Sequence, residues 1–218
     1  MASLAKRLTA EALGACILLA VVVGSGIMGV DLAQGNDAIA LLGATLATGA
    51  ILIVLILIFG EISGAHFNPA VTVAIWSRGD IATGHALAYI AAQIVGAVIG
   101  VILAHAMFDL ALVQMGATQR QGLGQALSEA VATFGLVLTI FGCARWRRDA
   151  VAMAVGLFIM AGYWFTASTS FANPAVTLAR TLTDSFAGIR AIDAPAFIIA
   201  QLVAAVLAAR LSAWLFAD

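Results

Sequence analysis

Two copies of the tripeptide Asn-Pro-Ala are the clearest candidates for residues that act on a small molecule. The copies are Asn68, Pro69 and Ala70, and Asn173, Pro174 and Ala175. Asparagine is a favoured N-cap and proline a favoured first helical residue, so each copy predicts the start of a helix. A helix N-terminus carries roughly half a positive charge, and an asparagine amide donates hydrogen bonds. Two such tips facing each other would oppose cations, protons included, and donate to a neutral solute.

Two carboxylic acids, Glu11 and Glu129, lie within long apolar runs. An ionisable group in such a position is costly and indicates a function. We interpret each carboxyl group as a partner for backbone N–H groups in the non-helical residues before an Asn-Pro-Ala, predicted at 61–67 and 166–172. The alternative is a proton relay, for which no second intramembrane acid accompanies either glutamate. Glu61, at the end of an apolar run, is predicted to be a loop residue.

The composition is that of a protein that lies in lipid. Of the 218 residues, 63% are hydrophobic and 10% are charged, whereas soluble domains usually have ~25% charged residues. The net charge of -1 excludes an electrostatic nucleic-acid binder. Cys16 and Cys143 lie in separate apolar segments and form neither a metal-ligand pattern nor a disulfide framework. We therefore expect a membrane protein with no metal, no cofactor and no catalytic site.

Six stretches are long and apolar enough to cross the membrane as helices, which takes about 20 residues. They are roughly 8–30, 38–60, 82–107, 123–143, 149–168 and 192–215. The two segments that start at Asn-Pro-Ala, 68–76 and 173–182, reach only about half that length and would enter the membrane without crossing it. Such a segment must be shielded by protein or line a wet cavity.

Basic residues indicate the orientation. Lys6 and Arg7 precede the first span, and the 144–149 connection carries three arginines, whereas the 31–37 connection has two aspartates and no basic residue. By the positive-inside rule, both termini and the 144–149 connection are predicted to be cytoplasmic. Six spans agree with termini on one side.

The two halves of the chain repeat each other. Glu11 corresponds to Glu129, the 68–72 segment reappears at 173–177, and Gln93 corresponds to Gln201. Each half therefore reads as two spans, a half-span and a third span, and three crossings make the second half enter from the opposite side. We predict one channel domain, 1–218, built from inverted repeats of about 1–118 and 119–218, with its site near the midplane.

Together these features resemble the aquaporin (major intrinsic protein) family. The resemblance covers nearly the whole chain and rests on Ser63-Gly64-Ala65-His66-Phe67-Asn68-Pro69-Ala70-Val71-Thr72, on Phe171-Ala172-Asn173-Pro174-Ala175, and on the two glutamates. It implies six transmembrane helices and two re-entrant half-helices, a pore in every protomer, a homotetramer, and passive transport without catalysis. It also implies that His66 lies near the pore wall and that the glutamates brace the half-helices. An inner membrane of a bacterium is the expected location.

The chain departs from most aquaporins directly after the second motif, where Val176 stands in place of an arginine. Carried over by spacing, the outer selectivity filter is predicted to consist of Thr48, Ala161, Ser170 and Val176. These side chains include no cation, aromatic ring or imidazole. We therefore predict a wide filter that passes water with glycerol, urea, ammonia, or neutral metalloid acids such as arsenous acid and methylated arsenicals. Bacterial channels associated with arsenic resistance look like this chain at the second motif.

Arg180 lies one helical turn beyond Val176 and on nearly the same face. Two interpretations are open for its side chain. It either stands in the outer vestibule, where it attracts anions and partly replaces the missing arginine, or it snorkels to the membrane interface.

Two alternative functions accompany the wide channel. An ordinary water-selective aquaporin would share the same motifs. A proton-coupled secondary transporter also has inverted repeats with broken helices, but it needs acids near the crossing point, for which Glu11 and Glu129 are the candidates. Flux that saturates and accumulates solute against a gradient would identify the transporter.

Overall fold

The computed structural model describes residues 2–217, and within that range six helices are long and apolar enough to cross a membrane. They are α1 (Leu4–Ala33), α2 (Asp37–Ser63), α4 (Thr83–Met107), α5 (Leu123–Trp146), α6 (Val151–Phe165) together with the 3-10 turn that precedes it, and α8 (Ala194–Leu215). Two short helices are α3 (Pro69–Ser77) and α7 (Pro174–Ala179). Single 3-10 turns adjoin α6 and α7, at Arg148–Ala150 and Arg180–Leu182. The predicted all-α fold of six spans and two half-helices is confirmed.

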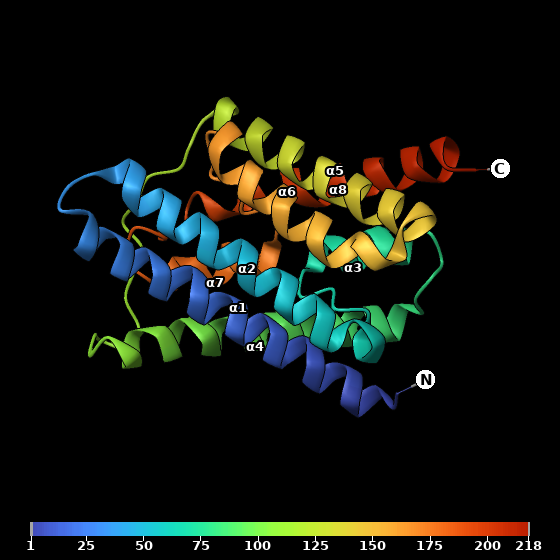
Figure 1. The fold of residues 1–218 in the computed structure, drawn as a ribbon, viewed down its shortest axis with the longest axis horizontal. Coiled ribbons are helices and arrows are strands. Elements are labelled where there is room, and N and C mark those ends of the chain that lie inside the picture. The colour runs from blue at the N-terminus through green and yellow to red at the C-terminus, as the bar shows by residue number, and fades with distance from the viewer. Residues whose placement is uncertain (1, 218) are drawn as a thin grey trace.

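The long helices run side by side, and both ends of the chain lie at the same end of the bundle (Figure 1). The connection between α5 and α6 also lies at that end. Of the three arginines predicted there, Arg145 is in the last turn of α5, and Arg147 and Arg148 follow directly after the helix. The half-helices α3 and α7 are enclosed between the long helices. This arrangement agrees with an even number of crossings.

The two halves interlock through their half-helices. Within each half the same pairs pack, α1 on α4 and α2 in the first half, and α5 on α8 and α6 in the second. Each half-helix contacts a long helix of the other half as well, because α3 packs on α8 and α7 packs on α4. Large apolar side chains such as Leu57, Leu87 and Leu207 remain exposed on the outer faces, as expected for helices that face lipid.

Some boundaries differ from those predicted. Helix α2 continues through Ser63, so Glu61 is an exposed helical residue and its prediction as a loop residue is wrong. The helix ends at Gly64, whose φ of 89° lies in the left-handed region that favours glycine. The first non-helical lead-in therefore begins at Gly64, and α7 gives way to a 3-10 turn after Ala179.

Helices α1 and α4 touch backbone to backbone at two glycines. A Cβ atom placed on Gly96 would collide with the carbonyl oxygen of Ala12, and one on Gly100 with that of Cys16. Small residues four apart permit this close approach in the membrane, where helix association depends on van der Waals packing.

We predict that Gly96→Ala destabilises the protein, because the added methyl group must push α1 away from α4, and overpacking typically costs about 1–3 kcal/mol. Thermal denaturation in detergent would measure the loss. Gly84→Ala is the matched control, since Gly84 lies on the same helix and a Cβ atom added there would meet open space. An equal loss in both variants would contradict this account of the contact.

Candidate functional site

The N-termini of α3 and α7 meet inside the bundle, joined by their asparagines. The Oδ1 atom of Asn68 accepts a hydrogen bond from the Ala70 N–H (2.8 Å), and that of Asn173 accepts from the Ala175 N–H (2.9 Å). Each amide also reaches across to the other half. Asn68 Nδ2 donates to the Ala172 carbonyl (2.7 Å) and Asn173 Nδ2 to the Phe67 carbonyl (2.9 Å). One N–H of each amide is thereby used between the halves, and the second is left to face a solute.

The residue before each asparagine is held in an unfavourable backbone conformation. Phe67 and Ala172 both have φ of 47°, in the left-handed region that non-glycine residues rarely adopt. Such a conformation costs of order 1–3 kcal/mol and persists only where the surroundings impose it. Here it presents the two carbonyl groups that accept the asparagine amides. Neither an alanine nor a phenylalanine signals this conformation in the sequence.

Glu11 holds the first lead-in from α1. Its Oε1 atom accepts hydrogen bonds from the Ser63 hydroxyl (2.6 Å) and the His66 N–H (3.0 Å). Its Oε2 atom accepts from the Phe67 N–H (2.7 Å) and from Gln93 Nε2 (2.7 Å). The side chain is fully buried. The carboxyl group therefore satisfies the peptide N–H groups that directly precede Asn68.

Glu129 makes the equivalent contacts from α5. It accepts from the Phe171 N–H (2.9 Å) and the Ala172 N–H (2.8 Å), and Gln201 Nε2 donates to its Oε2 atom. Gln201 also donates to the Thr177 hydroxyl (2.9 Å), as Gln93 does to Thr72 in the first half. Neither glutamine is among the site residues predicted from the sequence, although their matching places in the repeat are the signal that could identify them.

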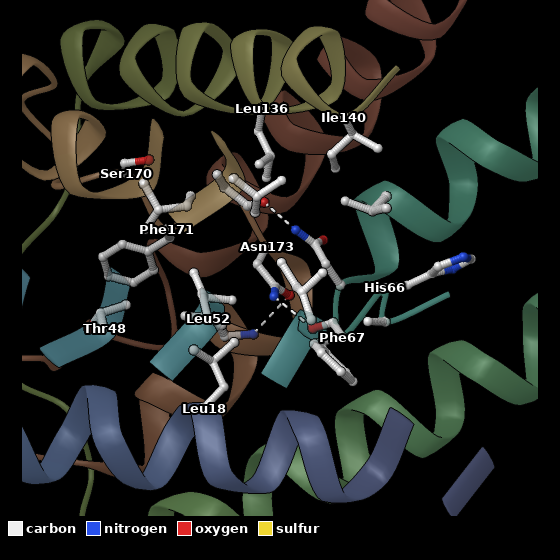
Figure 2. A pocket seen from close by; sticks show the side chains of 18 of the residues that line it. Leu18, Thr48, Leu52, His66, Phe67, Leu136, Ile140, Ser170, Phe171 and Asn173 are labelled. Atoms are coloured by element: carbon white, nitrogen blue, oxygen red, sulfur yellow. Dashed lines mark hydrogen bonds between the residues drawn. The ribbon is translucent and has the colours of Figure 1, made fainter. Parts of the chain in front are cut away.

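A cavity of about 100 Å³ runs past the paired N-termini of α3 and α7. Most of its wall is apolar, and the wall includes Asn68 and Asn173 from the two half-helices. Figure 2 shows Thr48 and Ser170 on one side of Asn173, with Ile140 and His66 on the other. The lining residues are Leu18, Val22, Thr48, Leu52, Ile56, Gly64, Ala65, His66, Phe67, Asn68, Val71, Ile75, Leu136, Ile140, Val151, Val155, Ile159, Tyr163, Ser170, Phe171, Ala172, Asn173, Val176 and Arg180.

Three of the four predicted filter residues, Thr48, Ser170 and Val176, line this cavity. Ala161 does not, and its prediction is wrong. It is exposed on the same outward face of α6 as Leu157, because the helical period turns Ile159 and Tyr163 inward instead. The Tyr163 hydroxyl donates to Thr48 Oγ1 (3.2 Å).

The cavity wall also holds a cation and two aromatic rings that the predicted filter set lacks, because Tyr163, Phe171 and Arg180 line it as well. Arg180 is only 4% exposed, so its side chain does not snorkel to the interface. His66 lines the cavity as well, and its Nδ1 atom lies 3.1 Å from the Thr72 hydroxyl.

Hydrogen bonds to Asp193 hold the connection between α4 and α5 against the start of α8. Asp193, at the N-terminus of α8, accepts hydrogen bonds from the Arg120 N–H (2.8 Å) and from Arg190 Nε (3.0 Å). The Arg190 guanidinium lowers the pKa of the Asp193 carboxyl group, so this acceptor stays ionised at neutral pH. Within residues 2–217 no group of three or more His, Cys, Asp or Glu side chains could hold a metal ion.

We predict that Glu129→Gln destabilises the protein. The amide replaces an acceptor oxygen with donors, and a buried N–H that loses its partner costs about 1–3 kcal/mol. The melting temperature in detergent should therefore fall by about 3–10 °C. Glu61→Gln is the matched control, because it removes an exposed carboxyl group from α2 and should leave the melting temperature unchanged. A Glu129→Gln variant as stable as the control would refute the bracing role.

Comparison with known proteins agrees with this geometry. The family model described as major intrinsic protein matches residues 1–151 and 144–217. The chain is 54% identical to the aquaglyceroporin AqpS of Rhizobium meliloti over 212 residues, which covers 97% of this chain and 91% of the relative. It is 35% identical to the probable aquaporin AqpM of Archaeoglobus fulgidus over 243 residues, covering 98% of this chain and 96% of that protein.

The fold is also found among solved structures. The X-ray structure of the aquaglyceroporin from Plasmodium falciparum aligns with a TM-score of 0.71 at 19% identity, and the alignment covers 96% of this chain and 95% of the other. That likeness shows the fold, while the family model and the relatives above 30% identity extend over nearly the full length. The chain is thus a multi-pass integral membrane protein that belongs to the major intrinsic protein (aquaporin) family of channels, which are not enzymes.

Proposed function

We propose that this protein is a passive channel that conducts water and small uncharged solutes through a pore in each protomer. The observation that carries the proposal is the cavity beside the tips of α3 and α7, with Asn68 and Asn173 in its wall. The apolar side chains in the cavity wall offer a solute few hydrogen-bond partners. A solute is therefore bound weakly and passes quickly. The asparagine amides compensate for part of the water that a solute loses.

The same tips oppose cations. Each half-helix presents its positive end to the cavity, and the asparagine side chains cap both ends. Because the cavity wall has a low dielectric constant, the two positive helix ends raise the energy of a cation or a proton at the narrowest point of the cavity. A neutral solute does not meet this barrier.

The cargo we propose is water together with glycerol, urea, ammonia and neutral metalloid acids such as arsenous acid or methylated arsenicals. Two observations support solutes larger than water. Thr48, Ser170 and Val176 are small residues in the cavity wall, and the relative with 54% identity is named an aquaglyceroporin. A strictly water-selective pore is the alternative, which the flux comparison below tests.

The proton-coupled transporter has less support. It requires an acid that can take up and release a proton or an ion during transport. Glu11 and Glu129 instead spend both carboxyl oxygens on hydrogen bonds to backbone and side-chain donors of the lead-ins. Removing those bonds in each cycle would release the half-helices.

The proposed assembly is a homotetramer in a bacterial inner membrane, with both termini cytoplasmic. The arginine-bearing connection between α5 and α6 lies at the same end as the termini, which is the end that the positive-inside rule assigns to the cytoplasm.

We predict that proteoliposomes containing the protein pass water, glycerol, urea, ammonia and arsenous acid faster than empty vesicles. Stopped-flow light scattering measures these rates. Flux should rise linearly with the gradient and run equally in both directions. Water flux alone would support the water-selective alternative, and saturable uptake against a gradient would support the transporter.

We predict that Val176→Arg lowers glycerol and urea permeability more than water permeability. The long side chain narrows the cavity beside Ser170 and Thr48, and a narrower opening excludes larger solutes first. Val176→Leu is the control for added volume without charge. Equal reductions for all solutes would show that residue 176 does not lie at the size-selecting constriction.

A further inference from the structure

Arg180 enters the cavity from the end of α7 although the sequence places it four residues beyond the position where a filter arginine is expected. Its side chain is 4% exposed, and it lines the cavity with Val176 and Ser170. The guanidinium carbon lies 3.4 Å from the centroid of the Phe171 ring, and Nε donates to the Ala187 carbonyl. These two contacts fix the guanidinium plane against the cavity wall.

The terminal amines of Arg180 have no acceptor among residues 2–217, where its side chain donates through Nε alone. The contrast with Arg120 is informative, because that guanidinium lies 5.0 Å from the same Phe171 ring. The Arg120 side chain donates hydrogen bonds to the carbonyls of Gly188 (2.9 Å) and Ser168 (3.2 Å). Arg120 therefore anchors the outer connections, whereas Arg180 keeps two donor groups for a partner in the cavity.

A second buried polar group beside the cavity lacks a partner as well. Ser170 is 3% exposed, and its Oγ atom makes no hydrogen bond with the described residues. This oxygen is almost inaccessible and lies beside Gly162 of α6, so it is turned toward that helix. Arg180 therefore supplies the donors to the cavity, against the apolar wall formed by Val176.

We propose that Arg180 supplies the cation of the outer constriction, in place of an arginine at position 176, and that its terminal amines bind the acceptor oxygens of passing neutral solutes. This inference rests on the proposed channel function and names the residue that sets its charge selectivity. Arginine stays protonated at any physiological pH, so the positive charge is permanent.

The solute class that suits this site carries one or more hydroxyl or carbonyl oxygens on a compact neutral body. Polyols, urea and undissociated oxyacids have that form. A hydrated cation or a proton meets the guanidinium before it reaches the half-helix tips, so the pore has two positive barriers in series. Removing one of them should raise proton leak without abolishing neutral flux.

The test compares Arg180→Gln, Arg180→Lys and the double variant Val176→Arg/Arg180→Gln in proteoliposomes. Proton leak is followed with an entrapped pH-sensitive dye under a clamped potential, and water permeability of the same vesicles shows that each variant is folded. We expect proton leak per unit of water permeability to rise at least about threefold in Arg180→Gln. It should stay near the wild-type value in Arg180→Lys and in the double variant, which both retain a cation.

Arg210→Gln is the matched control, because it removes an exposed arginine from α8, and it should leave the leak unchanged. Wild-type leak in Arg180→Gln, with water permeability intact, would overturn the inference while the channel function stands. If Arg180→Gln conducts no water, a raised leak in Arg180→Lys would overturn it instead. A wild-type protein without water or solute flux would refute the proposed function itself.

Discussion

Every peptide group inside a lipid-embedded protein must find its partner within the protein, and the non-helical residues before Asn68 and Asn173 face this requirement most acutely. The structure meets it with two buried carboxyl groups, each carried by the first long helix of its half. With Glu11 and Glu129 in place, two strained residues present their carbonyls to the asparagines of the opposite half. The position of both half-helix tips, and of the cavity beside them, depends on these bonds.

The charge selectivity that we propose depends on groups that are fixed in the structure. The half-helix ends contribute partial charges that are fixed by the backbone. The asparagine oxygens cap these ends, and one N–H of each asparagine amide is left for the cavity. Arg180 adds a full charge further along the same wall. Because these groups are held by packing and by hydrogen bonds, a neutral solute passes without a conformational cycle, which is the behaviour of a channel.

Much of the fold could be predicted from the sequence, because lipid imposes long apolar spans and the repeat of Asn-Pro-Ala identifies both half-helices. The glutamates could be matched to the lead-ins for the same reason. Counting residues from the Asn-Pro-Ala motifs could not predict which side chains of α6 point into the cavity. Each residue along α6 turns the side chain by about 100°, and Tyr163, two residues beyond Ala161 and therefore on nearly the opposite face, lines the cavity. The inward path of Arg180 depends on its contacts with Phe171 and Ala187, which the spacing of the motif does not predict.

The central claim is that the paired N-termini of α3 and α7 flank a continuous watery passage. A crystal structure of the protein grown from a lipid phase, at a resolution that shows ordered water, tests it most directly. We expect a file of water molecules that continues on both sides of the tips, with one water within hydrogen-bond distance of Asn68 Nδ2 or Asn173 Nδ2. Asparagines that lie apart, or a passage filled by packed side chains, would contradict it.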